Sequence, residues 1–387
     1  MERIYLDHNA TTPVDPSVLA SMLPFLRENF GNPSSIHYEG QVAKQALNQA
    51  RKEVADCLNA EPSEVVFTSC GTESDNMALI GIYDQFHKKG QHIITTEVEH
   101  SAVIRSCEYL ESHGAKTTYL KVNREGLLDL NEYEKSFTDK TILVSIMLAN
   151  NETGIIYPIK KMAEIAHKNG ALIHTDAVQA VGKMKVDVKD LNVDLLSLSG
   201  HKIYAPKGVG ALYVKKGIPC TSVVKGGTQE KGRRGGTENL AAIVGLGSAM
   251  LRLINEQEKD NQKIKKLRDH FEKAVLKIIP YTFVNGAQEP RVGNTSNICF
   301  KGVEGEGVIL SLDLKGIGAS SGSACSSGAI EPSRVLLAMG RTKEEAGASV
   351  RFSFGKSNTE EQVERVLEVL PGTIEKLRTY SPISLKA

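Results

Sequence analysis

Residues 171–202 read ALIHTDAVQAVGKMKVDVKDLNVDLLSLSGHK, and they contain two short apolar runs, each followed by a chemically active side chain. The first run, ALIHT, leads into Asp176, and the second, VDLLSLS, leads into Gly200, His201 and Lys202. In open parallel sheets, ligands bind outside the carboxyl ends of the strands. We therefore expect Asp176 and Lys202 to face one ligand site at the edge of such a sheet.

Short β-rich runs alternate with amphipathic stretches from about residue 64 to residue 215. The runs that predict strands are EVVFTS, QHIITTEVE, TILVSIML, ALIHTDAV, VDLLSLSG and GVGALYVKK. Continuous apolar strands that alternate with helices indicate a mostly parallel sheet covered on both faces. The sequence therefore predicts an α/β core.

The rest of the chain predicts a second, smaller unit. Residues 238–279 lack proline and show helical periodicity, which predicts one long or broken helix that leaves the core. The later segments SNICFKG, GVILSLDLKG and ASVRFSFGK mix strand and helix patterns. With 387 residues and 41% hydrophobic content, two domains are expected. We place a large domain over residues 15–260 and a small α+β domain over residues 1–14 and 261–387.

Composition argues against several classes of partner. Lys and Arg number 47 against 46 Asp and Glu, and no run of like charge favours nucleic acid or anionic lipid. The start, MERIYLDHNA, lacks the apolar core of a secretion signal, and the longest uncharged apolar stretch, residues 239–251, is too short to span a bilayer. Six cysteines without a C-x-x-C pair predict free thiols in a reducing compartment and no zinc site. We expect a cytoplasmic protein.

Two further strand ends carry candidate groups whose interpretation stays open on the residues alone. After EVVFTS comes CGTESDN, where Gly71 allows close backbone approach and Thr72 supplies a hydroxyl. The start of a helix here could hold phosphate, or Thr72 could simply cap the helix. After QHIITTEVE comes His100, which could be a catalytic imidazole or a polar residue that opens a helix.

A strand-end carboxylate and a strand-end lysine are the pair that a pyridoxal phosphate enzyme needs. The lysine forms a Schiff base with the cofactor, and the carboxylate pairs with the pyridinium nitrogen. Taken separately, Asp176 could be a cap and Lys202 a surface charge, but with the phosphate-loop candidate they favour a cofactor site. Nucleotide and zinc hydrolase sites are disfavoured, because G-x-G-x-x-G and H-E-x-x-H are missing and Val350 replaces the first glycine of a P-loop before GKS.

One low-complexity segment, SSGSACSSG at residues 320–328, holds a single thiol, Cys325. Serine and glycine leave a backbone free to move, so the segment could be a tether that carries a nucleophile between two places. The alternative is a linker that happens to contain a cysteine.

Motifs spread over residues 5–355 resemble a known family. They are YLDHNATTPVDP, GNPSS, TSCGTESDN, ANNETG, HTDAVQAVG, SGHKIYAPKGVG, GRRGGTEN, GSACSSG and SVRFSFG. In this order they resemble the group I cysteine desulfurases of the NifS/IscS type, in the class-V aminotransferase family. The resemblance implies a fold-type I pyridoxal phosphate enzyme, with a mostly parallel seven-stranded sheet in its large domain.

The resemblance also implies a role for each matching position. Lys202 would form the Schiff base, Asp176 would pair with the pyridine nitrogen, and His100 would stack on the ring. Gln179 would face the cofactor's phenolic oxygen. The residues that would hold the cofactor's phosphate are Gly71, Thr72, Ser199, His201 and, from the neighbouring subunit of a homodimer, Thr237. Asn151 and Arg351 would hold the substrate carboxylate, which suits the bidentate guanidinium.

The implied reaction converts L-cysteine to L-alanine and leaves a persulfide on Cys325, which supplies a scaffold or other acceptor protein in iron–sulfur cluster assembly. Lys202 would take the α-proton of the substrate, and His100 would draw the proton from the thiol. Cys70 departs from many family members beside the phosphate loop and is interpreted as structural. The alternatives are a selenocysteine lyase, an aminotransferase that has no need of Cys325, and a scaffold that has lost activity. General cluster assembly, nitrogenase maturation and tRNA thiolation all remain open as destinations of the sulfur.

Overall fold

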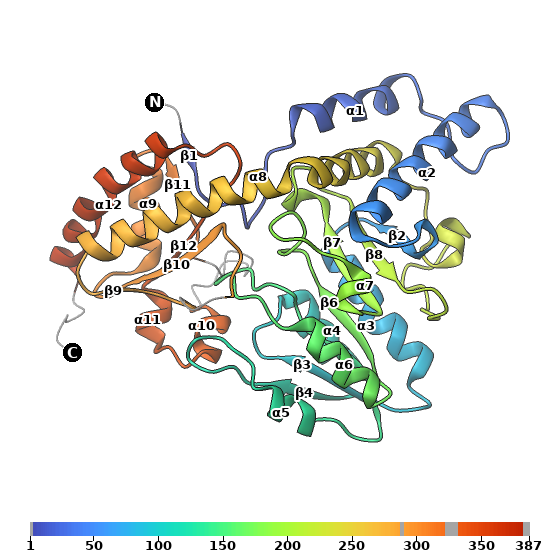
Figure 1. Cartoon of the computed structure of the whole chain (residues 1–387), viewed down its shortest axis with the longest axis horizontal. Coiled ribbons are helices and arrows are strands. Elements are labelled where there is room, and N and C mark those ends of the chain that lie inside the picture. The colour runs from blue at the N-terminus through green and yellow to red at the C-terminus, as the bar shows by residue number, and fades with distance from the viewer. Residues whose placement is uncertain (1–2, 287–289, 322–331, 382–387) are drawn as a thin grey trace.

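The computed structural model describes residues 3–286, 290–321 and 332–381 (Figure 1). Within them the largest sheet has seven strands in the order β2-β8-β7-β6-β5-β3-β4. The strands are β2 (Val65–Thr68), β3 (His92–Thr96), β4 (Lys116–Leu120), β5 (Thr141–Ser145), β6 (Leu172–Asp176), β7 (Leu195–Ser199) and β8 (Gly210–Val214). Strand β8 is antiparallel to both neighbours, and the other pairs are parallel. The predicted α/β class with a mostly parallel seven-stranded sheet is confirmed.

Strand β4 is absent from the runs that predicted strands. It lies at the edge of the sheet, parallel to β3, and its residues KTTYL are mostly part-exposed. An edge strand has only one neighbour and is not covered as fully, so it has no need of the continuous apolar run that marks a central parallel strand.

Helices cover both faces of this sheet (Figure 1). One face packs against α3 (Gly71–Phe86) and α4 (Ser101–Glu111), in a core that includes Met77, Ile82 and Val103. The core on the other face includes residues of α1 (Pro16–Arg27), α2 (Tyr38–Leu58), α6 (Ile159–Lys168) and the start of α8 (Leu240–Ile278). Because side chains alternate along a strand, residues two apart face the same helix layer.

Helix α8 is one continuous long helix. Of the two forms that the sequence predicts, one long helix or a broken one, the long helix is confirmed. Its first half packs on α1 and α2, whereas its second half supplies Ile264, Phe271 and Val275 to a separate hydrophobic core. That core covers a three-stranded antiparallel sheet and further helices, which are β9 (Thr282–Val284), β10 (Thr295–Phe300), β12 (Ser349–Ser353), α9 (Gly305–Asp313) and α12 (Glu360–Tyr380). The helix therefore joins the two cores as a single rod.

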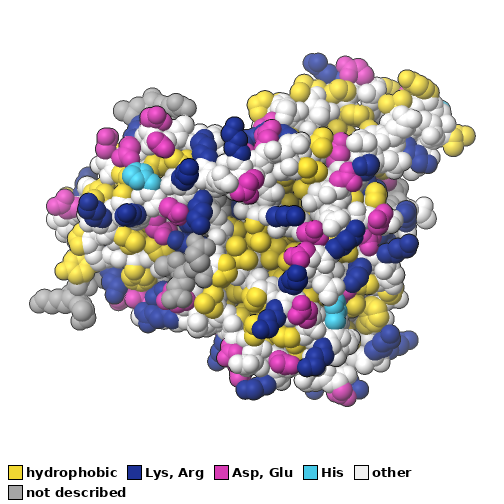
Figure 2. All heavy atoms as spheres, in the orientation of Figure 1, with side chains coloured by type: hydrophobic (Ala, Val, Ile, Leu, Met, Phe, Trp, Pro, Cys, Tyr) yellow, Lys and Arg dark blue, Asp and Glu magenta, His cyan; other side chains and the backbone are white. Residues whose placement is uncertain are grey.

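The N-terminal strand β1 (Ile4–Tyr5) forms a short parallel pair with β11 (Ile317–Gly318), which lies far away in the sequence. The remaining short elements are η1 (Pro62–Glu64), α5 (Leu130–Lys135), α7 (Val188–Leu191), η2 (Gly200–Lys202), η3 (Gln229–Gly232), α10 (Arg334–Ala338) and α11 (Lys343–Gly347). Figure 2 shows basic and acidic side chains interspersed over the visible face, in agreement with the balanced composition. No described helix combines the length and the apolarity that a membrane crossing requires.

Candidate active site

The carboxyl ends of β6 and β7 bring the decisive residues of the sequence together. Asp176 is the last residue of β6, and its register partner on β7 is Ser197. Strand β7 ends two residues later at Ser199, and the short helix η2 then ends with Lys202. Asp176 and Lys202, the pair expected from the sequence, therefore lie together at the carboxyl ends of two central strands.

Asp176 is a buried carboxylate with a favourable set of neighbours. Its Oδ1 accepts a hydrogen bond of 2.9 Å from the backbone N–H of Val178. Burial raises the pKa of Asp176 above its ordinary value, and the neighbouring His100, the Val178 amide and Lys202 offset part of that rise. A carboxylate in this setting can pair with a cationic ring nitrogen.

Lys202 is held by the backbone of an N-terminal segment. Its Nζ donates to the carbonyl of Asn9 at 2.5 Å and to the carbonyl of Ala10 at 2.7 Å. Gln179 donates from Nε2 to the same Asn9 carbonyl at 3.0 Å. Asn9 thus gathers two predicted cofactor residues, although the sequence analysis gave it no role. The signal was present, because Asn9 lies within the motif YLDHNATTPVDP.

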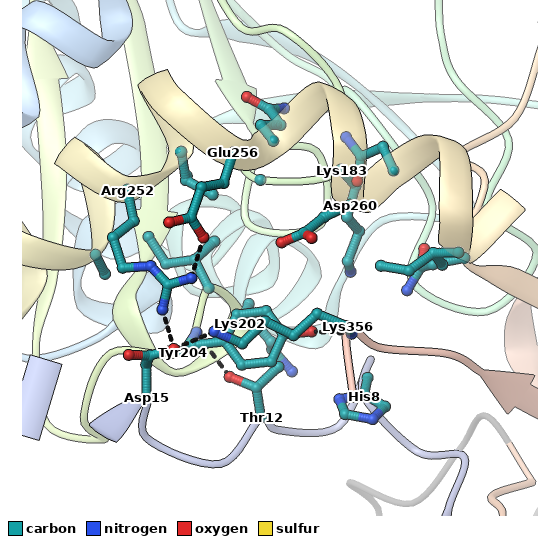
Figure 3. A pocket seen from close by; sticks show the side chains of 18 of the residues that line it. His8, Thr12, Asp15, Lys183, Lys202, Tyr204, Arg252, Glu256, Asp260 and Lys356 are labelled. Carbon is teal, nitrogen blue, oxygen red and sulfur yellow. Dashed lines mark hydrogen bonds and ion pairs between the residues drawn. The ribbon is translucent and has the colours of Figure 1, made fainter. Parts of the chain in front are cut away.

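A second amine, Lys183, lies in the same cluster and was missed. Its Nζ donates to Asn9 Oδ1 at 2.9 Å and to Gln179 Oε1. Burial and the neighbouring charges of Lys202 and Arg351 hold the pKa of Lys183 well below its usual range. Figure 3 shows Lys183 and Lys202 at a narrow cavity of about 50 Å³, which His8, Tyr204 and α8 also line.

The start of α3 forms an anion cradle beside this pair. A Cβ on Gly71 would lie 2.7 Å from Val178 Cγ2 and 3.5 Å from Ser199 Cβ, so only glycine allows this close approach. The hydroxyl of Ser199 is buried and has no hydrogen-bond partner among the described residues. A helix N-terminus next to an unsatisfied hydroxyl suits a phosphate group, so the residues present fit pyridoxal phosphate.

Two other members of the predicted cradle lie nearby in different settings. Thr72 is exposed in the first turn of α3, and the cap of that helix is Cys70, whose Sγ accepts from Glu73 N–H at 3.5 Å. The alternative in which Thr72 caps the helix is therefore wrong, because the helix begins one residue before it. His201 contacts Thr11 Oγ1 through Nδ1 at 3.1 Å, and burial lowers its pKa to about 4.

His100 is the N-cap of α4, at the end of the loop after β3. Its Nδ1 accepts from the backbone N–H of Ala102 at 3.1 Å, so the neutral imidazole carries its proton on Nε2. The electrostatic influence of His100 on Asp176 places the two side chains in one neighbourhood. The interpretation of His100 as a polar residue that opens a helix is confirmed, and its role as a catalytic imidazole stays a prediction.

Arg351 and Asn151 are brought together, but through the main chain. Arg351 is buried on β12, and its Nη1 donates to the carbonyl of Asn151 at 2.9 Å. Its Nη2 donates to Asp7 Oδ1 at 2.8 Å. Asp7 was not predicted from the sequence. It accepts a hydrogen bond from Nη2 of Arg351, which a substrate carboxylate would also need.

The remaining predicted residues lie outside this cluster or outside the described chain. Thr237 is exposed and lines a separate hollow with Ser69 and Arg234, so its expected contact with a neighbouring subunit stays a prediction. Cys325 lies outside the described residues. Burial raises the pKa of four further thiols, which disfavours their thiolate forms: Cys57 to about 11, Cys220 and Cys299 to about 12, and Cys107 further.

The chain is similar over its whole length to proteins with a common description. A family model described as aminotransferase class-V matches residues 4–366. The chain is 50% identical over 383 residues to "Cysteine desulfurase IscS" of Methanosarcina thermophila, covering 99% of this chain and 95% of that protein. It is 47% identical over 384 residues to "Cysteine desulfurase IscS" of Clostridium botulinum, covering 99% and 97%.

Solved structures agree with these sequence relatives. A protein titled "NIFS-LIKE PROTEIN" superposes with a TM-score of 0.91 at 38% identity, covering 98% of this chain and 100% of that one. A structure titled "SspA in complex with cysteine" superposes with a TM-score of 0.82 at 36% identity, covering 92% and 100%.

Proposed function

We infer that this chain, which belongs to the aminotransferase class-V family, is a pyridoxal phosphate-dependent cysteine desulfurase that converts L-cysteine to L-alanine and keeps the sulfur as a persulfide. The observation that carries the inference is the convergence of Asp176, Ser199 and Lys202 at one sheet edge, beside the start of α3. Each of these groups suits a different part of the cofactor.

We assign the cofactor contacts residue by residue. Lys202 would hold the cofactor covalently, Asp176 would pair with its ring nitrogen, and His100 and Gln179 would contact its ring and phenolic oxygen. The phosphate would lie among Gly71, Thr72, Ser199 and His201. When bound, pyridoxal phosphate withdraws electrons from the substrate's α-carbon, which makes the α-proton acidic. Lys202, as the amine at this position, would take that proton.

Arg351 orients the substrate by binding its carboxylate next to Asn151. The guanidinium is fixed by the Asn151 carbonyl, so its direction is set before the substrate arrives. A carboxylate that binds there competes with Asp7 for the same donors. Orientation at a fixed, buried arginine determines which bond of the amino acid faces the reacting groups.

Cys325 completes the reaction as the nucleophile that takes the sulfur. The thiolate sulfur of Cys325 forms a bond to the substrate sulfur, the substrate C–S bond breaks, and its electron pair stays with the carbon that becomes the methyl group of alanine. L-cysteine and a thiol thus give L-alanine and a persulfide without any external oxidant. For His100 to draw the proton from the Cys325 thiol, as we propose, its Nδ1 would first release the hydrogen bond from the Ala102 amide, because that nitrogen is the basic one of the neutral imidazole.

Described residues on both sides of Cys325 support its place at this site. Ser320 is paired with the backbone of Arg351, and Ser333 donates from Oγ to Glu152 Oε2 at 2.5 Å, directly beside Asn151. The described chain therefore lies beside Arg351 before residues 322–331 and at Glu152, the residue after Asn151, behind them.

We further propose that the enzyme acts as a cytoplasmic homodimer in which Thr237 completes the partner's phosphate site, and that its sulfur goes to a protein acceptor for iron–sulfur cluster assembly. The proposed large domain is residues 15–260, and the small domain is residues 1–14 and 261–387. The names of the relatives support the use of cysteine as the sulfur source, and the two hydrophobic cores joined by α8 support the division into two domains.

The test is to incubate the purified yellow protein with L-cysteine and a reducing thiol. Equal amounts of L-alanine and sulfide are expected. Formation of an oxo acid with loss of the cofactor's aldehyde would indicate an aminotransferase instead, and a strong preference for selenocysteine in a paired assay would indicate a lyase specific for selenium.

A further inference from the structure

A row of buried polar side chains lies beneath Asp176, on the face of the sheet that α3 covers. Ser145 Oγ on β5 is 2.9 Å from His174 Nδ1 on β6, and His174 Nε2 is 2.9 Å from Ser197 Oγ on β7. All three side chains are fully buried. Since His174 and Asp176 are two residues apart on one strand, they share this face, and Ser197 is the register partner of Asp176.

Asp75 reaches this row from α3. It is only 1% exposed, and its Oδ1 lies 3.7 Å from His174 Nε2, without a hydrogen bond to any described residue. The pKa of His174 is lowered to about 3 by burial, so the imidazole is neutral and offers Asp75 no compensating charge. None of the proposed cofactor contacts uses Asp75.

Asp75 and Asp176 form a pair of buried carboxyl groups in unequal surroundings. Asp176 has three neighbours that lower its pKa, which are His100, the Val178 amide and the ammonium of Lys202. Burial raises the pKa of Asp75 well above its usual range, and the neighbouring carboxyl of Asp176 raises it further, whereas the hydroxyl of Ser197 lowers it. Two adjacent carboxyls do not both ionise readily, so the charge belongs on the better stabilised one.

We propose that Asp75 is a positioning residue: a neutral carboxylic acid that donates its proton to Ser197 and so holds the row beneath Asp176, while the negative charge stays on Asp176 alone. This inference rests on the cofactor site proposed above and deepens it. Every member of the row is then satisfied, because Ser197 donates to His174 Nε2 and His174 donates from Nδ1 to Ser145. An ionised Asp75 would reverse the direction of these donors and put the imidazole proton on Nε2.

The first test uses two variants of Asp75 in the holoenzyme. Asp75→Asn keeps the size and a donor to Ser197, so the pH midpoint of the cofactor's absorption band should stay within about 0.3 units, and its dissociation constant within about threefold. Asp75→Leu keeps a similar volume but removes the donor, and the dissociation constant should rise about tenfold. A downward shift of the midpoint in Asp75→Asn would show that Asp75 is charged and would overturn the proposal. Loss of thermal stability in Asp75→Leu with an unchanged dissociation constant would also overturn it.

The second test needs no variant and separates this inference from the proposed function. Nitrogen-15 NMR of histidine-labelled wild-type protein should find the His174 proton on Nδ1. A proton on Nε2 would contradict a neutral Asp75. Protein that stays colourless with added pyridoxal phosphate would contradict the proposed function, while the position of the His174 proton would still decide the state of Asp75.

Discussion

Ser320 and Arg351 exchange two backbone hydrogen bonds, with N···O distances of 2.6 and 3.1 Å. Ser320 opens the segment SSGSACSSG, and Arg351 is the residue proposed to hold the substrate carboxylate. The start of this segment is therefore hydrogen-bonded to the strand that carries the proposed carboxylate-binding residue. Five predictions follow from this site and from its surroundings.

Replacement of Cys325 with serine should abolish sulfur transfer, because a hydroxyl is a weaker nucleophile and does not hold a persulfide. Alanine formation should fall at least about 100-fold, whereas the spectral change on adding L-cysteine should persist. The enzyme labelled with sulfur-35 cysteine should carry its label on Cys325 in peptide maps. Cys70→Ser is the matched control and should retain the label; a label on Cys70 in the wild type would refute the assignment.

Reduction of the yellow protein with borohydride should fix the cofactor on Lys202, and Lys202→Ala should lose covalent attachment. The demanding control is Lys183, because this second amine has a depressed pKa and lies in the same cluster. Covalent attachment should survive in Lys183→Ala. A modified peptide that contains Lys183 instead of Lys202 would show that Lys183 forms the Schiff base and would refute the assignment of Lys202.

Arg351→Lys should raise the KM for L-cysteine roughly 10–100-fold with a smaller change in kcat, because an ammonium lacks the two parallel donors of the guanidinium. The same exchange at Arg341, a buried arginine over the ring of Phe283, should leave the KM unchanged. An equal rise in the KM for both variants would mean that general destabilisation, and not carboxylate binding, explains the effect.

Ser199→Ala should weaken cofactor binding about tenfold, because the phosphate loses a buried hydroxyl donor. Ser106 on α4 offers a close control, since its hydroxyl is also buried without a partner among the described residues. Ser106→Ala should leave the dissociation constant unchanged. The two constants can be compared by titrating cofactor-depleted protein with pyridoxal phosphate and following the absorbance.

Glu99 should make the protein less stable as the pH rises. Burial raises its pKa in the folded protein to about 8 from an ordinary value of 4.5, so between these values the folded state binds a proton that the unfolded state has lost. The stability gained is complete below pH 4.5 and is lost as the pH rises through 8, with a slope of at most about 1.4 kcal/mol per pH unit. Urea unfolding at pH 6 and pH 8 should show a smaller decrease for Glu99→Gln than for the wild type. An unchanged decrease would show that Glu99 is already ionised when folded.

The sequence predicted the fold and the site best where a strand and the polar residue at its end lie next to each other in the chain. Central strands such as β6 and β7 need continuous apolar runs, and a ligand site needs polar residues at their ends, so Asp176 and Lys202 could be located from local patterns. Strand β4 lacked that signal because an edge strand tolerates lysine and threonine. Cys70 as a helix cap was also unexpected, because a thiol is not among the favoured capping side chains.

Residues that act through distant contacts could not be found in the same way. Asp7 meets Arg351 across 344 positions, and Lys183 meets Asn9 across 174. Local periodicity carries no information on such pairs, which depend on how the two cores are placed around α8. The same applies to Asp75, whose helical position gives no sign of the imidazole beneath it.

Because Asn9 contacts residues from distant parts of the chain, the order in which the chain is synthesised matters for the site. Its side chain and backbone bind Lys202 and Gln179 on one side, and Asn294, Thr295 and Ser353 on the other. A ribosome makes Asn9 long before it makes Ser353, so the nascent chain carries an incomplete site through most of translation. Sulfur chemistry therefore begins only when the late part of the chain has closed around the early part, and a truncated translation product would release no sulfide.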